Sequence, residues 1–393
     1  MFSPDLVFFD ECAHARELST LIPISYFEPD AWFFVGDWRQ MSPYVGSHGL
    51  GCAQLHLSLL ERVNRKYPLP WQLCTNHRAL GDLHKLPSTL FYDSKMISPH
   101  SDERKFPDSL NHLRDYFLSF KDAKSQTPKS IVPRFMIDCG AVEKRFFRSF
   151  WNPYHQTWVM KRVRELLDDP AFTQPNSSEP GTILIVSPYG EAFQRYRSAV
   201  ERIYVPEKRL RVEARTLGTA QGAEADVVFV DMVKQQASEF SNDDKRLCVA
   251  LTRARQAEVI MMASSMASPP KYEYDPHNLR AIFSGCRSGQ HGTWMHISKG
   301  LEKPKQDQDN TEKGSEEGGE RASIVGNCEG VSPQKSQESE KPGAADSDSN
   351  AAKSHGEDDG GVDPVPSLIH LHIGGSDGST EDKGIPVASS GAS

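Results

Sequence analysis

Residues 226–230 read DVVFV, an apolar run that is typical of a buried strand. Three further strand candidates lie at 182–186 (TILIV), 211–214 (RVEA) and 259–262 (VIMM). Helical patterns occur before and between these runs, at 155–168 and 191–204. Because strands that alternate with helices form a parallel sheet with helices on its faces, the sequence predicts an α/β fold.

Two shorter apolar runs near the N-terminus, LVFF at 6–9 and AWFFV at 31–35, end in an acidic pair and in a Gly-Asp step. Buried parallel strands end in this way where they deliver polar side chains to a ligand crevice. We expect a helix between the two runs and another at 57–63. Prolines interrupt the chain just before Trp71, which predicts a domain boundary, and the polar segment 101–129 is expected to be an irregular insertion.

The chain has 393 residues and a formal net charge of -8, and its acidic residues are concentrated toward the C-terminus. Segment 299–393 holds 19 acidic and 9 basic residues, and no Phe, Tyr or Trp follows Trp294. Such a segment cannot bury enough apolar surface to offset its conformational entropy, so we expect a disordered tail. Residues 1–298 hold 36 basic and 34 acidic residues, a balance that is compatible with binding to nucleic acid.

The seven cysteines are odd in number, scattered, and nowhere in C-x-x-C spacing. This pattern argues against a disulfide framework and against a structural zinc site. Acidic residues interrupt the first apolar run, and no stretch approaches the roughly 18 apolar residues that a membrane helix needs. We therefore expect a cytoplasmic or nuclear protein without a signal peptide, a membrane span or a structural metal.

Asp10 and Glu11 come directly after the first apolar run. Hydrolysis of a nucleoside triphosphate needs one carboxylate to hold magnesium and another to orient or deprotonate the attacking water, and adjacent residues at a strand end can supply both. Gly36, Asp37 and Gln40 follow the second run, where the last two can project into the same crevice. Taken alone, either pattern could also be an ordinary strand terminus.

Four further motifs follow in order, reading TNHR at 75–78, VSPY at 186–189, RTLGTAQGAE at 215–224 and RLCVALTRAR at 246–255. We expect the last of these to be a helix that presents its arginines to one side. Together with the two N-terminal motifs, they resemble the motifs of superfamily 1 helicases, in the up-frameshift and senataxin-like branch. The resemblance implies a RecA-like P-loop NTPase fold with a parallel sheet, and it implies ATP and Mg²⁺ as cofactors.

The resemblance assigns catalytic roles to residues of the N-terminal motifs and to two arginines. Asp10 would hold Mg²⁺, Glu11 would act on the attacking water, and Gln40 would sense the terminal phosphate. Arg78 would reach that phosphate across an interdomain cleft, although a tyrosine usually stands where this chain has His77. Arg253 would be the arginine finger, whose guanidinium neutralises charge on the transferred phosphoryl group.

The 215–224 motif is also assigned to the nucleotide by this resemblance. Gly222 would let the main chain approach the nucleotide closely, and Glu224 would form a hydrogen bond with the ribose. A small polar loop before the strand at 226–230 is the alternative interpretation.

The remaining assignments concern a single strand of RNA or DNA. A hydroxyl and a backbone N–H at a strand-end turn can bind a phosphate of the strand, and the turn at 187–189 and the threonines of the 215–224 motif fit this role. The residues are Ser187, Pro188, Tyr189, Thr216 and Thr219. Phe146, Phe147, Phe150, Trp151 and Trp158 could stack on bases. Their spacing favours the alternative, in which they pack within the core.

By this resemblance the protein is an ATP-dependent helicase that couples nucleotide hydrolysis to movement along a single strand. The implied organisation has four parts. They are 1–70 as a remnant of a first RecA-like domain, 71–267 as a complete second one, 268–298 as a poorly defined extension, and 299–393 as the disordered acidic tail.

The phosphate-binding loop G-x-x-x-x-G-K-[ST] does not occur in the 393 residues. We therefore expect a truncated or incomplete member of the family, whose own ATPase activity is left open. A second hypothesis is a non-catalytic module that binds nucleic acid or protein, with the tail as a site for protein partners. A third is an accessory chain that works with a separate chain carrying the loop.

Overall fold

The computed structural model describes residues 3–44, 55–68, 72–121, 132–140, 142–268 and 275–297. The predicted tail at 299–393 and the predicted boundary at Trp71 lie outside these residues. Among the described helices, none combines the length and the apolar composition that a membrane span requires.

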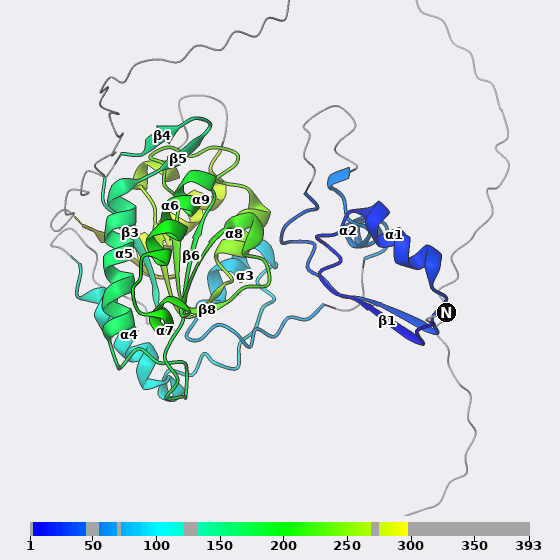
Figure 1. Ribbon diagram of the computed structural model, residues 1–393, viewed down its shortest axis with the longest axis horizontal. Helices are drawn as coiled ribbons and strands as arrows, with labels where there is room; N and C mark the ends of the chain where they lie inside the picture. Colours follow the sequence, from blue (N-terminus) through cyan, green and yellow to red (C-terminus); the bar gives the residue numbers. More distant parts are fainter. Residues whose placement is uncertain are drawn as a thin grey trace, which may run out of the picture. The chain divides into compact units, whose positions relative to one another are not determined.

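A six-stranded parallel sheet forms the centre of the fold, with the strand order β10-β3-β9-β8-β6-β7 (Figure 1). Because every pair of neighbours is parallel, the carboxyl ends of all these strands lie at the same edge of the sheet. The strands are β3 (Arg134–Asp138), β6 (Ile183–Ser187), β7 (Val212–Thr216), β8 (Ala225–Asp231), β9 (Ala254–Met261) and β10 (Thr293–His296).

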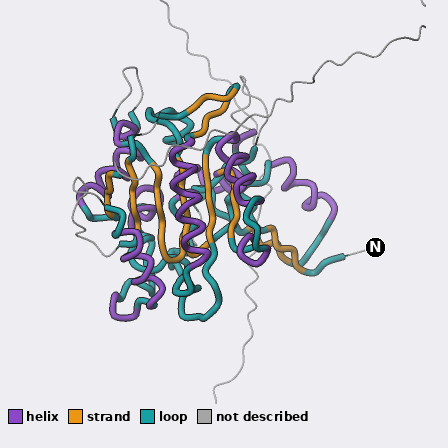
Figure 2. Tube along the Cα trace, turned by 60° about the vertical axis from the view of Figure 1, so that its left-hand side comes forward, coloured by secondary structure: helices purple, strands orange, loops and turns teal. Residues whose placement is uncertain are grey.

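Helices cover both faces of this sheet (Figure 2). They are α3 (Lys85–Phe91), α4 (Asp108–Leu118), α5 (Pro153–Asp168), α6 (Gly190–Glu201), α7 (Pro206–Arg209), α8 (Asp244–Ala250) and α9 (His277–Ser288). Short 3-10 turns occur at Glu103–Lys105, Leu217–Thr219 and Ser264–Ala267. The longest helix, α5, begins where the Asn152 side chain accepts hydrogen bonds from the backbone N–H of Tyr154 and His155, with Pro153 at the first helical position.

Alternate side chains of each strand point to opposite faces, so the sheet builds two separate cores. Val228 and Val230 pack with side chains of α3, α8 and α9 on one face. Val227 and Phe229 pack with side chains of α4, α5 and α6 on the other. Every residue of β3, β6 and β8 is buried, which explains why these strands read as continuous apolar runs rather than alternating ones.

The N-terminal part contains β1 (Leu6–Phe9), α1 (Glu17–Tyr26), β2 (Ala31–Phe34) and α2 (Leu59–Lys66). β1 and β2 pair in parallel as a two-stranded sheet, with Leu6 opposite Ala31. Phe8 and Phe33 stack at 4.5 Å between ring centroids, yet their side chains are 66% and 44% exposed. These strands were predicted to be buried, and in the described part of the chain they are largely exposed.

The predicted α/β fold with a parallel, helix-covered sheet is confirmed. The strand predicted at 259–262 begins earlier, at Ala254, because β9 pairs with β8 from Ala254 onward, whereas β3 pairs only with its second half, from Glu258. The helix predicted at 191–204 ends at Glu201.

The prediction of an irregular insertion at 101–129 is wrong for the residues that the structure describes. Asp108–Leu118 forms α4, and its Leu110, Leu113 and Phe117 are fully buried. Phe117 packs against Phe135 of β3 at 5.2 Å between ring centroids. The polar residues that suggested a loop lie on the outer face of this helix, because a four-residue spacing places Leu113 and Phe117 together on the inner one.

The segment 268–298 was expected to be poorly defined, but its described residues complete the sheet. β10 pairs in parallel with β3, and α9 covers one face. A buried ion pair joins Arg134 of β3 to Glu258 of β9, and Arg134 also donates to the carbonyl oxygens of His291 at 3.0 Å and Leu83 at 2.8 Å. This arginine therefore fixes the loop before β10 to the neighbouring strand.

Replacing Leu113 by Ala tests whether α4 is a packed part of the domain. Leu113 is fully buried, so we expect the free energy of unfolding to fall by about 2–5 kcal/mol in a urea titration. Asp115→Ala on the exposed face of the same helix is the control and should change stability by less than about 0.5 kcal/mol. Equal, small effects of both substitutions would contradict the packing of α4.

A buried polar cluster links α5 and α6 to the end of β8. His155 Nδ1 lies 2.7 Å from Asp231 Oδ1, and the Tyr196 hydroxyl donates to Asp231 Oδ2 at 2.8 Å. Burial alone would lower the pKa of His155, but the charge and hydrogen bond of Asp231 outweigh it and raise that pKa to about 10. The imidazolium–carboxylate pair is thus part of the folded state near neutral pH.

This cluster should make stability depend on pH. Because the folded pKa of His155 lies above its unfolded value, the stabilisation is complete below about pH 6.5 and is lost as pH rises through about 10. We expect the difference in unfolding free energy between the wild type and His155→Gln to shrink between pH 6.5 and pH 10 in denaturant titrations. The exposed His77→Gln should show no such trend. A difference that grows with pH would contradict the assignment.

Candidate functional site

The two adjacent carboxylates lie just beyond the end of β1. Glu11 has a left-handed backbone, with φ 51°, and its N–H donates to Asp10 Oδ1 at 2.9 Å. Both residues are exposed, and Gln221 Nε2 donates to Glu11 Oε2 at 2.6 Å. The neighbouring Gly222 has φ 77°, a conformation that glycine adopts without strain. The structure therefore brings the Asp-Glu motif to the 215–224 motif.

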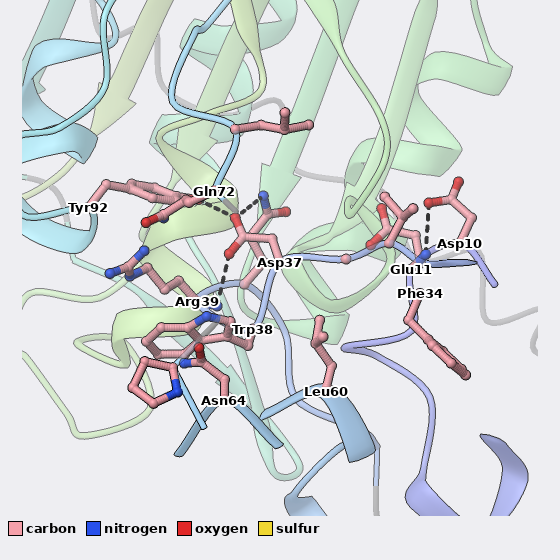
Figure 3. A pocket seen from close by; sticks show the side chains of 15 residues that line it. Asp10, Glu11, Phe34, Asp37, Trp38, Arg39, Leu60, Asn64, Gln72 and Tyr92 are labelled. Carbon is pink, nitrogen blue, oxygen red and sulfur yellow. Dashed lines mark hydrogen bonds between the residues drawn. The ribbon is translucent and has the colours of Figure 1, made fainter. Parts of the chain in front are cut away.

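The second N-terminal motif begins at Gly36, where the structure leaves no room for a Cβ atom. A Cβ on Gly36 would lie 2.9 Å from the backbone nitrogen of Ala13. Beyond it, Asp37 Oδ2 accepts hydrogen bonds from Gln40 Nε2 at 2.9 Å and from the Tyr92 hydroxyl (Figure 3). The close chain approach at Gly36 places Asp37 and Gln40 next to the segment that carries the two carboxylates.

Arg253 is buried, contrary to the prediction that 246–255 is a helix presenting its arginines to one side. α8 ends at Ala250, and Arg253 stands in the turn before β9 with 2% of its surface exposed. Its guanidinium donates to the carbonyl oxygens of Val249 and Ala223 and, through one terminal nitrogen, to Thr252 Oγ1 at 2.7 Å. The same nitrogen donates to Gln40 Oε1 at 3.1 Å. Gln40 thus connects Asp37 to Arg253.

Arg78 and Glu224 form an ion pair beside Arg253. Arg78 Nε donates to Glu224 Oε2 at 2.5 Å, and a terminal nitrogen donates to the Thr252 carbonyl oxygen at 2.9 Å. Burial opposes ionisation of Glu224, but the hydrogen bond and charge of Arg78, with the charges of Arg255 and Arg253, outweigh it and lower the pKa of Glu224. The carboxylate is therefore held ionised.

Burial lowers the pKa of Arg253 to about 10, and the like charge of Arg78 adds to the effect. Both causes disfavour the protonated guanidinium, so an anion placed between these two arginines would relieve an existing electrostatic cost. This is the electrostatic character of an anion-binding site.

A cavity of about 710 Å³ lies at the two N-terminal motifs, and neither Arg78 nor Arg253 is among its lining residues (Figure 3). Its lining includes both carboxylates and the whole 36–40 motif, with Tyr92 and Gln72. Polar groups that converge on a cavity of this size mark the default candidate for a ligand site.

The predicted nucleic-acid contacts lie at the carboxyl edge of the main sheet. Ser187 ends β6, Thr216 ends β7, and the two are directly paired in the parallel register. Thr216 and Thr219 hydrogen-bond reciprocally through side chain and backbone, which fixes the turn after β7. Tyr189 is buried, and its N–H lies 3.4 Å from Ser187 Oγ. A second cavity, of about 780 Å³, is lined by Thr216, Gly218, Thr219, Lys245 and Arg246 among others.

A family model described as an AAA domain matches residues 55–265, which is more than half of the chain. The chain belongs to this family. Its relatives identify it further as a member of superfamily 1, in the up-frameshift and senataxin-like branch of the helicases. The resemblance stated from the motifs is thereby confirmed.

Three curated relatives illustrate this similarity. The chain is 27% identical to helicase sen1 of Schizosaccharomyces pombe over 65% of its length, and 26% identical to the DNA-binding protein SMUBP-2 of Rattus norvegicus over 66%. It is 25% identical to the putative helicase MOV-10 of Gallus gallus over 69%. The matched regions make up 14%, 25% and 30% of those proteins, so the chain spans less than a third of each relative.

Among solved structures, the one titled "The structure of PRRSV helicase" matches 69% of this helicase-family chain and 34% of its own chain, at 19% identity and a TM-score of 0.30.

The motif analysis of this helicase-family chain missed several residues that the structure brings into the site. The Tyr92 hydroxyl lies 3.2 Å from Cys248 Sγ in addition to its bond with Asp37. Arg39 stacks its guanidinium over the Trp38 and Tyr92 rings, at 4.6 and 5.4 Å from their centroids. Trp38, Arg39 and Cys248 lie within the motifs, whereas Tyr92 lies at the end of α3, and sequence spacing does not reveal which of these side chains meet.

The aromatic residues at 146–158 were expected to pack within the core, and the structure divides them. Trp158 is buried, and Phe150 and Trp151 are partly buried, as expected. Phe146 and Phe147 are 47% and 82% exposed, so the prediction is wrong for these two.

No group of three or more His, Cys, Asp or Glu side chains that could hold a metal ion occurs among the described residues.

Replacing Tyr92 by Phe removes the hydroxyl that Asp37 and Cys248 share. Because a hydrogen bond to an ionised group is lost at a largely buried position, we expect the free energy of unfolding to fall by about 1–3 kcal/mol. Urea titration measures the change, and Tyr44→Phe, at a side chain that is 75% exposed, is the matched control. Indistinguishable results for the two variants would contradict the link between Tyr92 and Asp37.

Proposed function

We propose that this chain forms the carboxylate and arginine part of the ATP-hydrolysing site of a superfamily 1 helicase, which acts on single-stranded RNA or DNA. The observation that supports it most is the hydrogen-bond chain Asp37–Gln40–Arg253. It joins two motifs that lie far apart in the sequence, since 213 positions separate Gln40 from Arg253. The matched relatives include proteins named as helicases.

Asp10 and Glu11 fit the metal and water end of such a site. Mg²⁺ prefers oxygen ligands and is usually bound through one or two carboxylates, and both side chains reach solvent at the edge of the 710 Å³ cavity. Asp10 would hold Mg²⁺. Glu11, which Gln221 positions through its 2.6 Å hydrogen bond, would orient or deprotonate the attacking water.

Arg78 and Arg253 fit the terminal-phosphate end. Burial and the like charge of Arg78 already penalise the charge of Arg253, so an anion at this end would offset that cost. Arg253 would act as the arginine finger, a contribution on the order of 10³-fold or more in related NTPases. Gln40 would sense occupancy, because its oxygen accepts from Arg253 while its nitrogen donates to Asp37.

Glu224 and Gly222 would lie along the remaining part of the nucleotide, with Glu224 toward the ribose. Bound ATP with Mg²⁺ would supply the phosphoanhydride bond whose hydrolysis this family couples to movement along a strand. The residues of this chain bind and orient that bond's terminal group, and they hold the proton acceptor in Glu11.

The nucleic-acid strand would run along the carboxyl edge of the main sheet, over Ser187, Pro188 and Tyr189 and the threonine turn at 216 and 219. These groups contact backbone rather than base edges, so they suit RNA and DNA equally. We also propose that the protein acts in the cytoplasm or the nucleus and that protein partners bind its acidic segment. The scattered cysteines support a reducing compartment.

The second candidate is a non-catalytic module that binds nucleic acid or protein. It is favoured by the hydrogen bonds of the two arginines, which protein groups already satisfy in this arrangement: Arg78 by Glu224, and Arg253 by backbone carbonyls and Thr252. Such a module would bind a single strand with strong salt dependence and without any response to nucleotide.

The nucleotide dependence of strand binding separates the two candidates. We expect the affinity of the full chain for a labelled single-stranded oligonucleotide to change by at least about fivefold when Mg²⁺ and a non-hydrolysable ATP analogue are added. Fluorescence anisotropy measures this affinity. Because Arg78 lies at the phosphate end of the proposed site, Arg78→Ala should abolish the response.

Arg104→Ala, at a side chain that is 91% exposed, is the control and should keep the full response. An affinity that ignores nucleotide in the wild type would overturn the motor function and leave the non-catalytic module. A response that persists in Arg78→Ala would contradict the role given to this arginine.

A further inference from the structure

A short antiparallel hairpin presents two phenylalanines to solvent. β4 (Lys144–Phe146) pairs with β5 (Ser149–Trp151), with Phe146 opposite Ser149 and a two-residue loop of Phe147 and Arg148 (Figure 1). Phe146 is 47% exposed and Phe147 is 82% exposed, and the two rings meet edge to face at 4.8 Å. Packing within this domain therefore does not explain why either position carries a phenylalanine.

The backbone conformation at the hairpin tip disfavours a bulky residue such as Phe147. Phe147 has φ 50°, in the left-handed region that bulky residues rarely adopt. The first loop position of a two-residue hairpin with positive φ is one that favours glycine. A bulky residue that is both strained and exposed is a reason to look for a ligand.

The hairpin also carries three cations, of which Lys144 lies over the Trp151 ring at 5.8 Å. Lys144, Arg145 and Arg148 belong to the hairpin and are exposed, and none of the three forms an ion pair with another described residue. Arg145 Nε donates to the Phe147 carbonyl oxygen at 3.0 Å, which fixes the tip. Two carboxylates of adjoining segments have other partners, since Glu143 accepts from the Gln235 N–H at 3.1 Å and Glu191 pairs with Arg195 at 2.8 Å.

The second strand of the hairpin, β5, is fixed against the turn that carries Ser187, Pro188 and Tyr189. Ser149 Oγ accepts from the Glu191 N–H at 3.0 Å, at the start of α6. Phe150 meets the Tyr189 ring edge to face at 5.5 Å between centroids, and Lys234 lies over the Phe150 ring at 4.7 Å. The hairpin therefore continues the carboxyl edge of the sheet on which the proposed backbone contacts lie.

The same edge continues on the other side of Tyr189. The Phe240 ring lies 5.7 Å from the Tyr189 ring, and Arg246 lies over Phe240 at 4.2 Å. Arg246 in turn lines the 780 Å³ cavity that holds Thr216 and Thr219. Aromatic rings with cations on their faces thus run from that cavity to the hairpin.

We propose that the hairpin 144–151 is a binding element for single-stranded nucleic acid, in which Phe146 and Phe147 stack on bases and Lys144 and Arg148 contact phosphates. Exposed aromatic rings interleaved with cations that form no ion pair in the described part of the chain fit single-stranded nucleic acid, because each base offers a ring face and each phosphate a negative charge. The inference extends the strand path of the proposed function and rests on it for the class of ligand.

The test is Phe147→Gly in the full chain. Glycine removes the ring and relieves the backbone, so the variant should unfold at the same or a higher urea concentration than the wild type. Its affinity for a labelled single-stranded oligonucleotide should nevertheless fall by at least about fivefold. A merely structural role of the ring would not raise stability and weaken binding together.

Lys144→Ala with Arg148→Ala tests the phosphate contacts. We expect the slope of log affinity against log salt to become shallower by about 0.7 for each cation removed. Tyr204→Gly and Arg202→Ala with Arg209→Ala are the matched controls, because these exposed residues follow the C-terminal part of α6, at the opposite edge of the sheet. The controls should leave both affinity and slope unchanged.

The outcomes distinguish this inference from the proposed function. Undiminished binding by Phe147→Gly, in a chain whose affinity still responds to nucleotide, overturns the hairpin as a nucleic-acid element and leaves the motor intact. Weakened binding by Phe147→Gly in a chain that ignores nucleotide supports the hairpin and overturns the motor. No binding of RNA or DNA by the wild type overturns both, and it would make the hairpin a candidate for protein contact.

Discussion

In a sheet whose strands are all parallel, the carboxyl ends of the strands lie at one edge, and the positions of the candidate sites depend on this constraint. The strands are joined by crossover connections, most of which contain an α-helix, so polar residues from distant parts of the sequence follow neighbouring strands. Ser187 and Thr216 become direct partners in this way, although 29 positions separate them in the numbering. The candidate sites therefore lie on loops, while the two apolar cores hold those loops in place.

The buried arginine is the second organising feature, and its energetics point to an anion. Arg253 loses its hydration and lies near the charge of Arg78, and both effects lower its pKa to about 10. Backbone carbonyl oxygens and Gln40 compensate part of the cost in the present arrangement. A phosphate would compensate more of it, because it carries a full negative charge. In the proposed function, the residue that stabilises the turn before β9 would also provide electrostatic preorganisation for phosphoryl transfer.

The motif order and the main strands could be predicted from sequence because they depend on local pattern. Apolar runs identified β6 and β8, and the resemblance of the motifs to those of superfamily 1 helicases identified the candidate site. Prediction failed where long-range contacts decided the outcome. α4 is polar on one face, so only its packing on β3 shows that Leu113 and Phe117 are core residues. β10 lies far along the chain from β3, and its pairing follows from topology rather than from its own composition.

The sequence by itself determined the α/β class, the family motifs and the list of candidate site residues, because these are properties of residue type and order. Tertiary structure alone decided how those residues meet. It placed Arg253 in a buried turn instead of on a helix face, joined Gln40 to it, and gave Tyr92 a role beside Asp37. It also exposed Phe146 and Phe147 rather than burying them. The physical reason is that burial and side-chain contact depend on distances in space, which local sequence pattern does not specify.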